Sequence, residues 1–94
     1  MKAATLLIPT HYNNGEEIPF EYRQIFLREI GRRGIGGYTI MPTAMGVWGD
    51  QQEGMTPILI AGDEQTIRNL ASFAGGLFSQ EAIFVLWHER SELI

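Results

Sequence analysis

The chain has no cysteine and only two histidines among its 94 residues. Without cysteine there is no disulfide, no thiolate nucleophile and no cysteine-ligated zinc or iron–sulfur site. No apolar stretch approaches the roughly 20 residues that a membrane-spanning helix needs. The apolar run near the N-terminus is too short for a secretory leader and ends in Pro9. We therefore expect a soluble, cytoplasmic protein with no membrane partner.

Positive charge is also scarce, with 7 Lys and Arg against 11 Asp and Glu and a formal net charge of −4. Nucleic-acid binding requires a cationic surface that replaces phosphate counterions, so the balance argues against such a partner. A divalent metal could use His88 with Asp50 or Glu53, but an ordinary exposed hairpin is the favoured explanation of these residues. We expect neither a metal nor a cofactor.

What the sequence does contain is a set of periodic apolar segments in a chain of single-domain size, residues 1–94. Helical spacing predicts helices over 20–32, after Pro19, and from an N-cap at Asp63 to about residue 78. Strands are predicted over 4–8, 38–41 with 47–48 as an extension, 55–61 and 82–88. Pro57 cannot donate to a sheet ladder, so the third strand is expected to begin after it.

The predicted order β-α-β-β-α-β is the ferredoxin-like arrangement of the α+β class. Right-handed crossovers then place both helices on one face of a four-stranded antiparallel sheet. The last strand, IFVLW at 83–87, is apolar on both faces, and a strand of that kind must be covered twice. We expect another copy of the chain to cover the second face, which gives a homotrimer or a homodimer.

Two stretches carry a resemblance to known families. GGYTIMPTAMGVWGD, residues 36–50, resembles the second strand and hairpin of the P-II-like signalling proteins and the CutA-like proteins. The pair Gln80-Glu81 before an apolar strand is similar to that of uncharacterised bacterial ferredoxin-like domains with a Trp and a hairpin. The resemblance covers most of the chain by topology and few residues by identity. It implies a ferredoxin-like trimer. The connection 49–54 is shorter than the long P-II loop, which argues against a P-II-type partner-binding loop.

Candidate site residues are expected at one end of the sheet. If the strand ends meet as expected, they gather Thr10, His11, Tyr12, Tyr38, Gln80 and Glu81. His11, Tyr12 and Glu81 are the residue types of a general acid–base site. The alternative is a polar loop edge with solvated side chains. Trp48 is expected at the opposite end, with His88.

Two further features have a binding and a structural interpretation. Arg32 and Arg33, followed by a glycine-rich turn, could hold a phosphate, although the spacing matches no phosphate-binding fingerprint and a helix end explains it equally well. Trp48 and Trp87 could stack on a ligand, but core or interface packing is favoured for Trp87. The ligand-binding candidates are Tyr38, Trp48, Gln80, Arg32 and Arg33.

Three functions remain open on sequence alone. The first is a small oligomeric regulatory or ligand-binding protein, P-II-like in fold, with clefts between subunits. The second is a small cofactor-poor enzyme of the monooxygenase or isomerase type, with His11, Tyr12 and Glu81 as its acid–base groups. The third is a subunit whose only task is assembly. The apolar second face, the fold resemblance and the absence of a strong catalytic motif favour the first function.

Overall fold

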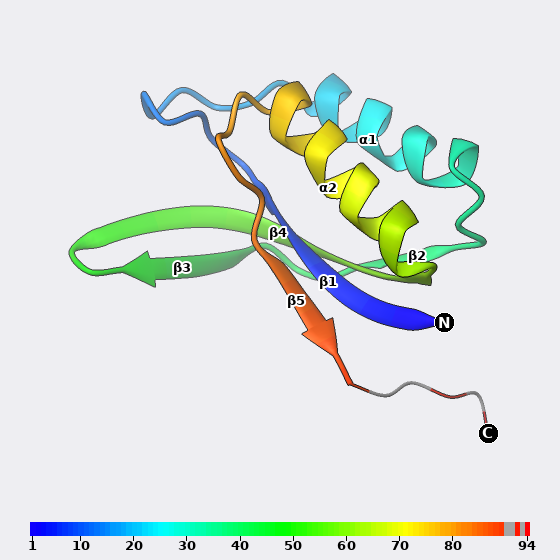
Figure 1. Ribbon diagram of the computed structural model, residues 1–94. Coiled ribbons are helices and arrows are strands. Elements are labelled where there is room, and N and C mark those ends of the chain that lie inside the picture. Colours follow the sequence, from blue (N-terminus) through cyan, green and yellow to red (C-terminus); the bar gives the residue numbers. More distant parts are fainter. Residues whose placement is uncertain (90–91, 93) are drawn as a thin grey trace.

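Two helices cover one face of a five-stranded antiparallel sheet in the computed structural model, which describes residues 1–89, 92 and 94 (Figure 1). The strand order is β2-β4-β1-β5, and β3 also pairs with β4. The elements are β1 (Lys2–Pro9), α1 (Phe20–Arg32), β2 (Tyr38–Ile40), β3 (Ala44–Trp48), β4 (Gln51–Gly62), α2 (Glu64–Leu77) and β5 (Val85–His88). No helix among the described residues is long and apolar enough to cross a membrane.

The core lies between the helices and the sheet. Leu6 of β1 and Ile58 of β4 are fully buried and face each other in register. The Phe26 ring of α1 meets the Phe78 ring at the end of α2, with centroids 5.9 Å apart and planes tilted by 57°. Asp63 caps α2, because the backbone N–H of Thr66 donates to its carboxylate at 3.2 Å. The predicted bounds of α1 and the predicted cap of α2 are confirmed.

β5 has an apolar side chain on each face, as the sequence predicts. Val85 and Trp87 pack against the core, and the guanidinium of Arg68 lies 5.3 Å from the centroid of the Trp87 ring. Phe84, just before the strand, and Leu86 are 51% and 50% exposed. Side chains alternate between the two faces of a strand, so these two belong to the open face, which no helix covers. The open face therefore carries apolar surface.

The second predicted strand is divided into β2 and β3 by residues 41–43. The backbone N–H of Met41 donates to the carbonyl of Pro57 at 2.9 Å. In an antiparallel ladder the N and O of one residue point to the same side, so the N–H that Pro57 lacks would also have faced this break. β4 therefore runs through Pro57 without losing a bond to β1. The expectation that this strand begins after Pro57 is wrong.

Strand lengths and directions determine which segments share an end of the sheet. β4 has 12 residues and β1 has 8, and their register pairs Pro9 with Met55. The first residues of β4, with β3, therefore project beyond the end of β1 (Figure 1). The backbone N–H of Thr10 donates to the carbonyl of Gly54 at 3.1 Å. This bond attaches the loop after β1 to the β3–β4 hairpin.

Candidate functional site

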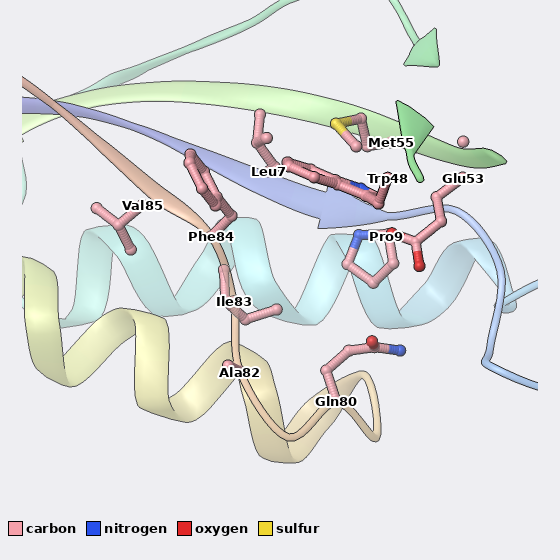
Figure 2. Close-up of a pocket in the computed structure, with 11 residues that line it drawn as sticks. Leu7, Pro9, Trp48, Glu53, Met55, Gln80, Ala82, Ile83, Phe84 and Val85 are labelled. Carbon is pink, nitrogen blue, oxygen red and sulfur yellow. The ribbon is translucent and has the colours of Figure 1, made fainter. Parts of the chain in front are cut away.

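A mostly apolar pocket of about 450 Å³ lies where β1 ends. Its walls come from the end of β1, the β3–β4 hairpin and the segment 80–85 that leads into β5 (Figure 2). The Trp48 and Phe84 rings meet at a centroid distance of 5.7 Å and a tilt of 40°. Leu7 and Met55 lie beside them in the same wall. Three segments that are distant in sequence thus build one aromatic pocket.

Local backbone features place these two rings. A Cβ on Gly46 would overlap the Met55 methyl group and would lie 3.1 Å from Nε1 of Trp48. Glycine at position 46 therefore lets the indole lie close over β3. On the other wall, the backbone N–H of Leu7 donates to the carbonyl of Phe84 at 3.1 Å. This bond fixes the backbone from which the Phe84 ring projects.

A larger, more polar cleft of about 840 Å³ adjoins the pocket. His11 and Tyr12 line it, and its lining shares Pro9, Glu53, Gly54 and Gln80 with the apolar pocket. The border between the two cavities is therefore where Glu53 and Gln80 lie, and Figure 2 shows these side chains at the same end of the pocket. Together the cavities offer an aromatic compartment with polar groups at one end, which is the usual make-up of a small-molecule site.

The polar groups of the cleft have defined partners. The Oγ1 of Thr10 and the Nδ1 of His11 lie 2.8 Å apart. Partial burial raises the pKa of Tyr12 above its ordinary value of 10.0, and the charges of Tyr22 and Glu16 raise it further. The Tyr12 phenol therefore stays protonated at neutral pH and can serve as a hydrogen-bond donor. It is poorly suited to act as a general base.

The structure brings together four of the sequence candidates, His11, Tyr12, Trp48 and Gln80, around these adjoining cavities. Glu81 is exposed, and it is absent from the described residues that line either cavity. Of the three proposed acid–base residues, His11 and Tyr12 therefore line the cleft and Glu81 does not. The expectation that Trp48 lies at the opposite end from His11 is wrong, because the hairpin projects from the start of β4, and that start lies beside the end of β1.

Tyr38 lies at the other end of the sheet, so its expected grouping with His11 is also wrong. β1 and β2 each pair antiparallel with β4 and therefore run parallel to each other. Tyr38 pairs with Ile60, and Ile60 pairs with Ala4 near the start of β1. The beginning of the second strand is thus beside the beginning of the first, not beside its end.

His88 is likewise far from the hairpin carboxylate of Glu53, so these two residues cannot share a metal ion. It pairs with Ala3, and its Nε2 lies 2.9 Å from Oγ1 of Thr5. Glu53 lines the cleft at the other end of β1. Among residues 1–89, 92 and 94, no group of three or more His, Asp or Glu side chains is placed to hold a metal ion.

Arg32 is the last residue of α1 and Arg33 is its C-cap. Figure 1 shows this end of α1 near the start of β2 and far from the β3–β4 hairpin. Both guanidinium groups pair with the carboxylate of Glu29, at 3.7 Å and 3.0 Å. The Arg33 guanidinium also lies 5.3 Å from the centroid of the Phe73 ring. These contacts fit the helix-end interpretation of the arginine pair. They place it outside the site described above.

Phe84, Met55 and the border position of Glu53 were not anticipated from the sequence. Phe84 alternates with the core-facing Val85, and that alternation was a usable signal for a side chain on the open face. No local signal marks Met55 or Glu53, because their place in the site depends on how far β4 extends past β1.

No protein-family model and no curated protein matches this sequence. Solved structures do match. CutA1 from Pyrococcus horikoshii superposes with a TM-score of 0.65 at 9% identity, over 100% of this chain and 87% of that chain. The divalent ion tolerance protein CutA1 from Ehrlichia chaffeensis superposes with a TM-score of 0.61 at 10% identity, over 99% and 83%. The chain has the CutA1 fold. This confirms the CutA-like resemblance and the ferredoxin-like α+β class, and identity this low establishes the fold alone.

Proposed function

We propose that this CutA1-like chain is a homo-oligomeric protein that binds a small molecule at the aromatic pocket, with further copies covering the open face of its sheet. The observation that carries the proposal is the continuity of the two features. Phe84 lines the pocket, and Leu86 lies two residues further along the same face, each about half exposed at 51% and 50%. Exposed apolar surface of this kind is typical of an interaction site.

The pocket itself has the properties of a ligand site. Its volume of about 450 Å³ falls within the usual range for small-molecule sites, and its walls are apolar with polar groups at one end. A homotrimer is the assembly that the family resemblance implies, and a homodimer is the alternative. In either case the pocket would lie close to a cleft between subunits. A cytoplasmic location and the absence of a nucleic-acid partner stay predictions.

The enzyme hypothesis has less support from the same geometry. Its raised pKa makes the Tyr12 phenolate still less available as a base, and the described lining of the two cavities includes Gln80 but not Glu81. His11 has Thr10 as its hydrogen-bond partner. Ligand binding needs only the apolar walls and the polar side chains that the pocket already has.

Native mass spectrometry of protein purified gently from its host tests the proposal, because it reports subunit number and any retained small molecule together. We expect the wild type to be a trimer or dimer. Leu86→Asp places a carboxylate on the open face and should give a monomer. Phe20→Asp is the matched control, since Phe20 is 61% exposed at the start of α1, in the helical layer. It should leave the assembly intact.

A wild type that is monomeric at micromolar concentration would refute the self-association. An oligomer that retains nothing, and that no compound stabilises in a thermal-shift screen, would refute ligand binding. That second outcome would favour the assembly subunit.

A further inference from the structure

We propose that the aromatic pocket is selective for a small hydrophobic amine in its protonated form. The inference deepens the proposed ligand-binding function and rests on it. The hydrophobic part of the ligand would lie against Trp48 and Phe84, and the ammonium group would lie at the border with the polar cleft, near Glu53 and Gln80. The structure thereby assigns a chemical class of ligand to the pocket.

The charge around the pocket carries the inference. Among the described residues that line it, Glu53 is the one with a charged side chain. A carboxylate attracts an ammonium group and repels an anion. The whole chain adds to this preference with its net charge of −4. The side-chain amide of Gln80 offers a carbonyl oxygen as a second acceptor at the same border.

The aromatic walls favour the same ligand. Trp48 and Phe84 meet at a tilt of 40° and remain 47% and 51% exposed, so part of each ring is open to the cavity. Ring faces attract cations as well as apolar groups, and tryptophan does so most strongly. A neutral apolar ligand would use the walls alone. A protonated amine would use the walls and Glu53.

Anionic ligands such as nucleotides and phosphates find no cationic side chain in the described lining. The described lining of the pocket contains no arginine or lysine. The basic pair Arg32–Arg33 lies at the far end of α1 and is engaged by Glu29. The pocket therefore discriminates by charge, and a set of ligands that share one apolar group and differ in charge can test it.

The experiment compares 2-phenylethylamine, 2-phenylethanol and 3-phenylpropanoate, which share the phenylethyl group and carry a positive, zero and negative charge. The full chain is used in its native assembly. The sequence has two tryptophans, so a Trp87→Phe background leaves Trp48 as its single tryptophan emitter. Titration of Trp48 fluorescence, with calorimetry as a second readout, gives the three affinities at physiological salt.

We expect the amine to bind roughly fivefold more tightly than the alcohol, because Glu53 is exposed and an exposed ion pair contributes up to about 1 kcal/mol. The propanoate should bind more weakly than the alcohol. Glu53→Gln should lower the affinity for the amine to about that for the alcohol and so abolish the preference. Asp50→Asn removes the same charge from the hairpin turn, outside the described lining of the pocket. It should reduce the preference for the amine far less than Glu53→Gln does.

Equal binding of amine and alcohol, or preference for the propanoate, would overturn the amine inference and leave ligand binding standing. Equal losses in Glu53→Gln and Asp50→Asn would show that the selectivity comes from long-range charge and would overturn the role of Glu53. Binding of none of the three at millimolar concentration would also overturn the inference. The retained mass in the native spectrum then decides the proposed function separately. Trp48 emission that depends on protein concentration and on no ligand would show that a second copy fills the pocket.

Discussion

Two leucines on neighbouring strands provide the sharpest test of the uncovered sheet face. Leu6 on β1 is fully buried under the helices, whereas Leu86 on β5 is 50% exposed on the opposite face. Leu6→Ala should lower the free energy of unfolding by about 3–5 kcal/mol, because it leaves a cavity in the core. For an isolated subunit, Leu86→Ala should cost only about 1 kcal/mol, half of what a fully buried leucine contributes.

If another copy covers the open face, the expected cost of Leu86→Ala becomes larger. If the open face is buried in the assembly, the exposed half of Leu86 is also removed from water, and truncation should cost about 2–3 kcal/mol per subunit. The cost should then depend on protein concentration, since an assembly is stabilised by mass action. Urea unfolding followed by circular dichroism at about 1 µM and about 100 µM separates the two cases.

We expect the wild type and Leu6→Ala to unfold at higher urea as the protein concentration rises. Leu86→Ala should lose most of that dependence. A Leu86→Ala cost of about 1 kcal/mol or less at both concentrations, the value for an isolated subunit, would refute the covered face. A Leu6→Ala cost no larger than that of Leu86→Ala would refute the assignment of the two faces itself.

Three further variants test the local structure. Gly54→Ala would place a Cβ 2.5 Å from Oγ1 of Thr10, so it should shift the NMR signals of the His11 ring and cost about 1–3 kcal/mol; unchanged signals would contradict this packing. Asp63→Ala removes the cap of α2 and should lower the free energy of unfolding by about 1 kcal/mol in urea. An unchanged free energy would show that the cap does not stabilise the protein. Tyr12 has a raised pKa in the folded state, so the native state holds its proton longer than the unfolded chain. The contribution of this pKa difference to the free energy of unfolding is fully present below pH 10.0, the ordinary pKa. It is lost as the pH rises through the pKa of the folded state. Tyr12→Phe should make the fall in stability between neutral and strongly alkaline pH smaller than in the wild type, and an equal fall would contradict the shift.

The local elements could be predicted from sequence because their signals are local. Pro19 precedes α1, and Phe26 and Ile30 repeat at helical spacing on its buried side. Asp63 is a capping residue type in front of a second periodic run, and its carboxylate does accept the expected bond. These patterns need no knowledge of which strand lies beside which.

Pro57 shows where local signals fail. A proline weakens a strand only if its missing N–H faces a paired neighbour. Here it faces residues 41–43, where the neighbouring strand is already broken. Which neighbour faces the missing N–H of Pro57 depends on the register of β4 with two other strands. The sequence around Pro57 therefore predicts a shorter strand than the structure contains.

The site depends on one further relation, the direction of β4. An antiparallel neighbour of β1 must begin where β1 ends, so the hairpin with Trp48 belongs beside His11. The predicted topology already implied this placement of the hairpin. The expectation that Trp48 lies at the end of the sheet opposite His11 rested on a wrong direction for this strand. The meeting of Trp48 with Phe84 did not follow, because it depends on the length of β4 beyond Pro9 and on the path of residues 80–85.

The placement of Phe84 and Leu86 links the two parts of the proposed function. They lie two residues apart on one face of the same segment, one in the pocket wall and one on the open face. A copy that covers Leu86 would also exclude water from the edge of the pocket, which strengthens the attraction between Glu53 and a bound cation. Coupling between sites is reciprocal. A ligand that binds the assembled form more tightly must therefore stabilise the assembly by the same free energy.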